Sequence, residues 1–197
     1  MRIRTWCWSI ARFTASRGSC CCTPIAPAIG GATNFQAPSY SSDTGLLYLA
    51  YQDANQRYFV DAQPFESGRQ YPGGRGAATG QPRTAGIKAI DPEDGHTVWS
   101  FPIVQGSLTA GVLATSGGVV FASSREGFLY ALDARRGTLL WKFQTGAGID
   151  ASPISYAVNG KQYVAVLVGS RQPPNIIPLA PELKNTSTAS MLFVFAL

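Results

Sequence analysis

One phrase of this sequence is written twice, and the repetition constrains the fold more than any other feature. Residues 89–101 read AIDPEDGHTVWSF, and residues 131–143 read ALDARRGTLLWKF. Both fit the pattern Ala-x-Asp-x-x-x-Gly-x-x-x-Trp-x-Phe, and they begin 42 residues apart. Repetition at a period of this size indicates an array of small structural units that stack on one another.

Each copy of the phrase predicts a β-hairpin, because an apolar run leads into the Asp and a second run leaves through the Trp. The Asp suits the start of a tight turn, the Gly falls where we expect a positive φ, and the Trp offers a flat surface to a neighbouring sheet. In the two copies these residues are Asp91, Gly95 and Trp99, and Asp133, Gly137 and Trp141. We interpret the aromatics as a repeated packing device between sheets; the alternative is that they bind a ligand.

A third, weaker copy is expected at residues 39–49, SYSSDTGLLYL, where a turn ending at Gly45 separates two apolar runs. Gly45 precedes Gly95 by 50 residues, and we assign the extra length to an insertion. Strand-turn-strand content at a period near 42 matches a four-stranded propeller blade, which usually takes about 40–50 residues. The prediction is therefore an all-β fold, a partial β-propeller of about three to four blades.

The composition agrees with this fold and excludes other classes. The 197 residues include 21 Gly and 13 Pro, and only 14% are charged, against a usual share of about 25%. The net charge of +5 owes much to four arginines near the N-terminus, and no Lys/Arg cluster is interleaved with aromatics, so we predict no nucleic-acid partner. We also predict no membrane span, because no apolar run approaches the ~18 residues required.

Cysteine and histidine are too few and too badly spaced for a metal site. The cysteines are Cys7, Cys20, Cys21 and Cys22. Three in a row do not match a zinc site, which needs pairs separated by two to four residues. The single histidine, His96, falls in a predicted turn, and we interpret it as an exposed turn residue rather than a catalytic base.

The first 28 residues do not share the pattern of the rest. An export signal needs a continuous apolar stretch of roughly 7–15 residues, and here Arg12 interrupts it. We predict that residues 1–28 are disordered or a mis-called start, the alternative being a degenerate export signal. Residues 29–197 form the predicted folded unit.

From Ile29 onward the chain resembles the C-terminal part of the pyrroloquinoline-quinone (PQQ) dependent, or quinoprotein, alcohol and glucose dehydrogenases. Beside the repeat, four stretches carry this resemblance: 30–49, 115–156, 158–169 and 192–197. The resemblance implies an eight-bladed propeller of which this chain holds three to four blades. It also implies that Asn34 contacts PQQ, as the Asn of the family's Gly-Gly-x-Asn-Trp segment does. Here residues 30–35 read GGATNF, with Phe35 at the position where the family often has Trp. A second contact falls to Val120 and Phe121, in a Gly-Gly-x-Val-(Phe/Trp) strand start.

Purely structural roles remain open for these residues. Asn34 could simply bond its own backbone, and Phe121 could be plain core. The family's catalytic Asp, the ligands for calcium or a lanthanide, and the Trp that stacks on PQQ lie upstream of the matched segments. No catalytic residue and no metal ligand is therefore assigned to this chain, and we expect it to be inactive alone.

The resemblance implies oxidation of an alcohol or sugar in the periplasm, with electrons passed to a cytochrome or quinone. Two other interpretations stay open: a non-enzymatic scaffold propeller of the outer-membrane assembly type, and a gene remnant without function. Residues 52–86 are expected to form an exposed connection between two strands, or a lid over the propeller axis. Residues 171–189 are expected to form a Pro-rich loop.

Overall fold

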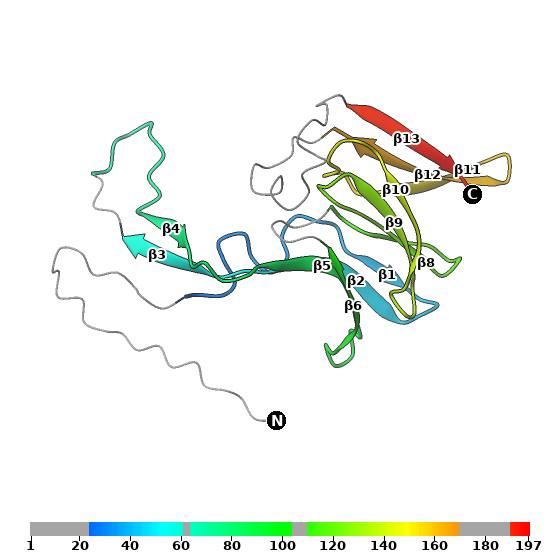
Figure 1. Ribbon diagram of the computed structural model, residues 1–197, viewed down its shortest axis with the longest axis horizontal. Coiled ribbons are helices and arrows are strands. Elements are labelled where there is room, and N and C mark those ends of the chain that lie inside the picture. The colour runs from blue at the N-terminus through cyan, green and yellow to red at the C-terminus, as the bar shows by residue number, and fades with distance from the viewer. Residues whose placement is uncertain (1–23, 61–63, 104–109, 170–189) are drawn as a thin grey trace.

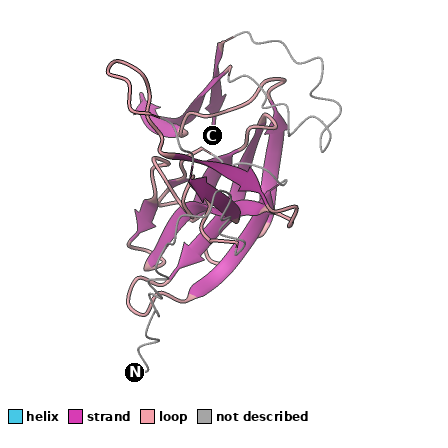
Figure 2. Ribbon diagram, turned by 90° about the vertical axis from the view of Figure 1, so that its left-hand side faces the viewer, coloured by secondary structure: helices cyan, strands magenta, loops and turns pink. Residues whose placement is uncertain are grey.

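The structure is a computed structural model that describes residues 24–60, 64–103, 110–169 and 190–197. Within these ranges the regular structure is entirely β, and Figures 1 and 2 show strands gathered into successive sheets. Most of the N-terminal segment and the predicted Pro-rich loop at 171–189 lie outside the described residues. The domain boundary at residue 29 stays a prediction.

The first sheet has four antiparallel strands in the order β1-β2-β5-β6. Its strands are β1 (Ser39–Ser41), β2 (Leu46–Asp53), β5 (Thr84–Ile90) and β6 (Thr97–Ile103). The second sheet repeats this plan, and its strands are β7 (Leu113–Ala114), β8 (Val119–Ser123), β9 (Phe128–Asp133) and β10 (Leu139–Gln144). Each four-stranded antiparallel sheet corresponds to one propeller blade.

The third sheet has three strands in the order β11-β12-β13. They are β11 (Ile154–Val158), β12 (Lys161–Val168) and β13 (Met191–Ala196). Figure 1 shows the three sheets following one another as separate blades. The predicted all-β, partial propeller fold is therefore confirmed.

Both copies of the repeated phrase form the hairpin that joins the third and fourth strands of a blade. Gly95 N–H donates to Asp91 O at 2.8 Å, and Gly137 N–H donates to Asp133 O at the same distance. The two glycines have φ values of 78° and 68°, which L side chains rarely adopt. The predicted hairpins, with Asp opening and Gly closing each turn, are confirmed.

The prediction that residues 39–49 are a third copy of the phrase was wrong. Residues 39–49 do form a hairpin, and Gly45 N–H donates to Ser41 O at 2.8 Å in the same turn geometry. This hairpin joins β1 to β2, however, and these strands share a sheet with β5 and β6. It is the first half of the blade that ends in the 89–101 phrase, so it does not mark a further unit of the array.

The insertion between β2 and β5 carries a ribbon of its own. Strands β3 (Gln56–Val60) and β4 (Gly74–Ala78) pair antiparallel and continue the direction of the two blade strands. Figure 1 shows this ribbon projecting away from the three blades. Ile25 pairs with Gln56 and adds a short bridge along its base. The sequence analysis did not predict this ribbon within the expected connection, because its strands, QRYFV and GRGAA, lack the apolar alternation that marks a strand.

Apolar side chains close the gap between the first two blades. Tyr48, Ile87 and Ala89 of the first blade and Val120 and Leu132 of the second are buried in one cluster. Each fully buried large side chain contributes roughly 1.5–3 kcal/mol relative to leaving it exposed. Neither sheet could bury these faces alone, so the stacking of blades is what stabilises them.

Trp99 fixes how the first blade sits on the second. Its indole N–H donates to the backbone oxygen of Ala134 at 2.9 Å, and its side chain is only 8% exposed. A Cβ on Gly137 would lie 2.5 Å from the indole ring, so the ring occupies the space that a side chain would need. The prediction that the repeated Trp packs between sheets is confirmed for Trp99.

Candidate functional site

The loop that carries Asn34 is fastened to the end of β2 by one residue, Gln52. Gln52 Nε2 donates to Gly31 O at 2.9 Å, and Gln52 N–H donates to Ala32 O at 2.8 Å. Gly31 N–H donates to Ala28 O at 2.8 Å and tightens the same loop. Together these bonds hold the segment before Asn34 against the blade. Gln52 lies far from the Gly-Gly segment in the sequence, which is why motif reasoning missed it.

The two glycines of this loop have a local structural reason. Gly31 has a φ of 73°, and a Cβ on Gly30 would lie 2.6 Å from Gln52 Nε2. The sequence interpretation was that Gly30 and Gly31 let the backbone approach a ligand. The structure instead shows that they let the loop turn and make room for Gln52.

Asn34 and Phe35 are both exposed at the end of this loop. Asn34 Nδ2 donates to Gly30 O at 3.1 Å. This is the local bond to the backbone that a purely structural role for Asn34 predicts. That bond uses one donor and leaves the amide oxygen of Asn34 outside any hydrogen bond of the described residues. Phe35 is 73% exposed, so its ring is available to a partner or ligand.

Gln36, the next residue, is buried and carries an unsatisfied acceptor. It is 5% exposed, and its Oε1 has no hydrogen-bond partner among the described residues. Buried polar atoms are nearly always paired, so an orphan acceptor marks a place where a water or ligand donor is expected. Its position directly after Asn34 and Phe35 makes this segment the best candidate for a ligand contact.

The same segment lies close to the residues that lead into β7 and β11. Val112 N–H donates to Ala37 O at 3.0 Å, just ahead of β7. A Cβ on Gly111 would lie 2.9 Å from the backbone of Ala37 and 2.2 Å from Ser152 Oγ. Residues that precede β1, β7 and β11 therefore meet at one place, with glycine allowing the close approach.

Val120 and Phe121, the other two predicted contacts, lie inside the packing between blades. Both are on β8, and they are 0% and 5% exposed. Val120 belongs to the cluster shared with the first blade, and Phe121 packs with Ala131 and Val164 toward the third blade. These surroundings agree with the alternative that Phe121 is a core residue. A cofactor contact by either side chain stays a prediction.

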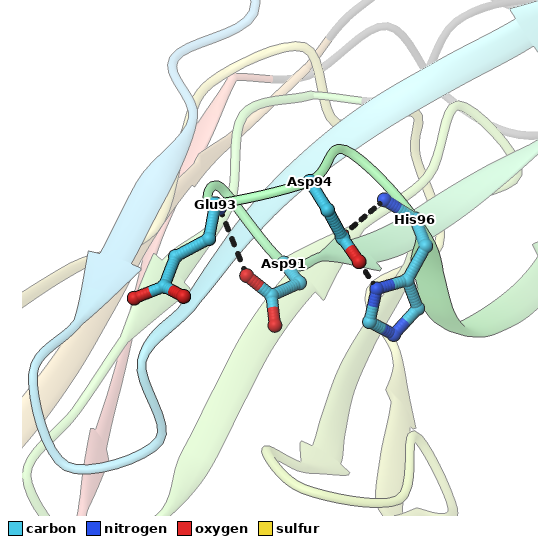
Figure 3. Close-up of polar contacts among 4 residues, drawn as sticks. All are labelled: Asp91, Glu93, Asp94 and His96. Carbon is cyan, nitrogen blue, oxygen red and sulfur yellow. Dashed lines mark hydrogen bonds and ion pairs between the residues drawn. The ribbon is translucent and has the colours of Figure 1, made fainter. Parts of the chain in front are cut away.

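His96 lies in the exposed turn between β5 and β6 with three carboxylates (Figure 3). Its Nδ1 lies 2.6 Å from Asp94 Oδ1, and its backbone N–H donates to the same oxygen. That backbone bond, followed by the imidazole bond, lowers the pKa of Asp94. Asp91 Oδ1 accepts from Glu93 N–H and serves the turn. The interpretation of His96 as a turn residue agrees with this geometry.

Burial raises the pKa of two phenols in the core, those of Tyr48 and Tyr130. The pKa of Tyr130 rises to about 12, chiefly because the ring is buried and also because the charge of Glu126 lies near it. A phenol that keeps its proton to such a pH cannot act as a base near neutrality. We therefore assign Tyr130 to packing.

Two stacked four-stranded blades, each ending in the repeated hairpin and joined by the docking of Trp99, define a propeller built from PQQ-type repeats. The family model PQQ_2, described as outer membrane protein assembly factor BamB, matches residues 83–169. Quinoprotein alcohol dehydrogenase PedE of Pseudomonas putida is 37% identical over 147 residues, which are 74% of this chain and 23% of that protein. The chain belongs to the quinoprotein alcohol dehydrogenase family.

Solved structures support the same assignment. A quinohemoprotein alcohol dehydrogenase from Comamonas testosteroni has a TM-score of 0.70 at 26% identity, covering 88% of this chain and 27% of that one. A europium-containing methanol dehydrogenase has a TM-score of 0.76 at 25% identity, covering 88% and 34%. The chain thus spans about a quarter of the length of the curated relatives that it matches. No helix of the described residues is long and apolar enough to cross a membrane.

Proposed function

We propose that this chain is a cofactor-contacting part of a PQQ-dependent alcohol or sugar dehydrogenase, from the C-terminal blades of its propeller. The unsatisfied Gln36 Oε1, directly after the exposed Asn34 and Phe35, is the observation that carries the proposal. An exposed amide, an exposed aromatic ring and an orphan acceptor suit a planar molecule with polar edges. The family relationship makes PQQ the first ligand to test.

In this proposal Asn34 donates or accepts a hydrogen bond at the quinone edge, and Phe35 covers part of its face. Gln52 keeps their loop in place through its bonds to Gly31 and Ala32. Val120 and Phe121 contribute by fixing the position of β8. When bound, PQQ supplies the two-electron oxidation of the alcohol, which calcium or a lanthanide assists as a Lewis acid.

The chain alone is proposed to be inactive. The one cluster of metal-type ligands among the described residues is Asp91, Asp94 and His96, whose ligand atoms lie within 4.8 Å of one another on an exposed turn. Its side chains cap their own hairpin, so it does not provide a base next to Asn34. The base, the metal ligands and the electron transfer to a cytochrome or quinone, in the periplasm, are assigned to the remainder of such an enzyme.

Titration of the purified chain with PQQ, followed by quenching of Trp fluorescence, tests this proposal. We expect saturable binding that weakens at least tenfold in Asn34→Ala. Asn55→Ala, the same substitution at the base of the β3–β4 ribbon, should bind as the wild type does. Equal binding by all three proteins, or none, would contradict the proposed contact. Dye reduction by the chain with PQQ and Ca²⁺ would contradict inactivity.

A second candidate is a scaffold propeller that binds partner proteins through its loops and needs no cofactor. The match of residues 83–169 to a family model described as an outer-membrane assembly factor favours it. The two candidates differ in the role of the 30–36 segment. Under the scaffold interpretation, PQQ leaves the fluorescence of the chain unchanged and Asn34→Ala has no effect.

A further inference from the structure

The turn between β11 and β12 holds the one Asn-Gly pair of the sequence, Asn159-Gly160. Val158 and Lys161 pair across the two strands, so the loop between them has two residues. The φ values of these two residues are 52° and 78°. Two positive φ values in such a loop are typical of a type I′ turn, for which Asn-Gly is a preferred sequence. The pair therefore suits the turn, but asparagine is also a chemically labile residue.

The two groups of this turn that can react with each other are free. Asn159 and Gly160 are both exposed. Within the part of the chain that the structure describes, neither the side-chain amide of Asn159 nor the backbone N–H of Gly160 makes a hydrogen bond. A Cβ on Gly160 would meet nothing within 4 Å, so no neighbouring group shields the glycine nitrogen.

The exposure of this turn follows from its place in the blade. The corresponding turn of the second blade, between β7 and β8, exposes Ser116 and Gly117 although the third blade packs against that sheet. The corresponding turn of the first blade exposes Ser42 and Asp43 although the second blade packs against it. We therefore expect Asn159 to stay exposed when a further blade packs on the third sheet.

The one Asp-Gly pair of the sequence, Asp94-Gly95, shows how a turn can protect such a pair. Gly95 N–H donates to Asp91 O at 2.8 Å, so the glycine nitrogen is occupied. Asp94 Oδ1 accepts from the His96 backbone N–H and lies 2.6 Å from the His96 imidazole. These bonds lower the pKa of Asp94 and keep it a carboxylate, which an attacking nitrogen reaches poorly. Both pairs are exposed, but only Asn159-Gly160 has both reacting groups free.

We propose that Asn159 deamidates spontaneously and that the isoaspartate formed there disrupts the β11–β12 hairpin. The Gly160 nitrogen loses its proton to solvent and bonds to Cγ of Asn159, which closes a five-membered imide. The side-chain nitrogen takes a proton from solvent and leaves as ammonia. Water then opens the imide at one of its two carbonyls, giving aspartate or isoaspartate. The reaction is intramolecular, consumes one water and releases one ammonia, and it does not depend on the binding of PQQ.

Closing the imide requires Asn159 to leave its left-handed conformation, so the rate depends on how readily the turn opens. Among the described strands β11 pairs only with β12, just as β1 and β7 pair only with the second strand of their blades. Opening at this end of the hairpin therefore breaks the Val158–Lys161 pair and disturbs no third strand. Local openings that disturb so few contacts have a low free energy.

The two products differ in their effect on the hairpin. Aspartate visits the left-handed conformation and keeps the length of the backbone, so it preserves the turn. Isoaspartate routes the backbone through Cβ and Cγ, which adds one carbon to the loop. Since turn type and loop length fix the register of a hairpin, the longer loop is incompatible with the pairing of Val158 and Lys161.

The test follows the purified full chain in mildly alkaline buffer, folded and in urea, by peptide mapping with mass spectrometry. Isoaspartate is measured by an isoaspartate-specific methyltransferase with labelled S-adenosylmethionine. In the folded chain we expect Asn159 to convert at least tenfold faster than Asn34, which is also exposed but precedes Phe35 and donates to Gly30 O. Conversion in urea only, or no faster than at Asn34, would overturn the proposal.

Two variants separate the site from its consequence. Asn159→Gly keeps a residue that accepts a positive φ and removes the amide, so it should fold as the wild type does and give no isoaspartate in this turn. Freshly purified Asn159→Asp supplies the aspartate product alone. The isoaspartate form, separated by ion exchange, is expected to have a lower Tm than Asn159→Asp. Equal Tm values for these two forms, or isoaspartate in this turn of Asn159→Gly, would overturn the proposal.

Discussion

The indole N–H of Trp99 and the phenol of Tyr48 share one acceptor, the backbone oxygen of Ala134, at 2.9 and 3.0 Å. Both donors belong to the first blade, whereas Ala134 lies in the hairpin turn of the second and is 1% exposed. A buried carbonyl has two lone pairs, and here each is used by a different strand of the neighbouring blade. The position of one blade on the other is therefore fixed by two hydrogen bonds to a single carbonyl as well as by apolar packing.

Removing both donors should cost more than the sum of the single losses. Tyr48→Phe and Trp99→Phe each leave Ala134 O with one partner, whereas the double variant leaves it buried and unpaired, which costs an additional ~1–3 kcal/mol. Urea unfolding of the four proteins gives the coupling energy. Additive losses within about 0.5 kcal/mol would show that the shared acceptor does not couple the two residues.

Gly137→Ala should destabilise the chain far more than Gly95→Ala. Both glycines have positive φ, for which an L side chain costs about 1–2 kcal/mol. Only at Gly137 would the new Cβ also meet the Trp99 ring, and overpacking of this kind adds roughly 1–3 kcal/mol. At Gly95 nothing lies within 4 Å. Thermal unfolding measures the difference, and equal Tm losses would contradict the close approach.

The two turn aspartates should differ in their contribution to stability. Asp133 Oδ1 accepts hydrogen bonds from two backbone N–H groups, those of Arg135 and Arg136, whereas Asp91 Oδ1 accepts one, from Glu93. Asp133→Ala is expected to cost about 1 kcal/mol more than Asp91→Ala, the contribution of one such bond. Chemical denaturation of the two variants tests this order.

Stability should fall at alkaline pH because of Tyr130. Its pKa is about 12 in the folded chain against an ordinary value of 10.0, so the folded state holds the proton more tightly than the unfolded state. This contribution is complete below pH 10 and is lost as pH rises toward 12, on the order of 2 kcal/mol. Tyr130→Phe should flatten the decline between pH 10 and 12. An equally steep decline in Tyr130→Phe and in the wild type would contradict this assignment.

Local signals in the sequence predicted the hairpins, but not the position of each hairpin within a blade. The turn from Ser41 to Gly45 uses the same Gly N–H to backbone carbonyl bond as the turns of the two phrases. A turn motif therefore identifies a hairpin without saying which pair of strands it joins. That information lies in the pairing of β2 with β5, across the whole insertion.

The candidate site was predictable only in part, for the same reason. Asn34 and Phe35 were found through a short motif, and their exposure keeps a ligand contact open. The anchoring by Gln52 and the orphan oxygen of Gln36 depend on contacts that form only when distant segments meet. A single sequence carries no local pattern for either feature.

The docking of Trp99 on Gly137 has a consequence for how such chains can be cut, duplicated or recombined. The donor ring and its receiving turn are encoded in successive repeats, so this junction between blades is encoded half in one repeat and half in the next. A gene rearrangement that moves one complete sheet therefore separates an indole such as that of Trp99 from the turn that receives it. The indole loses its partner on one side of the cut, and the turn loses its partner on the other. The smallest self-contained unit of inheritance in this architecture is the junction, which is offset from the blade by half a repeat.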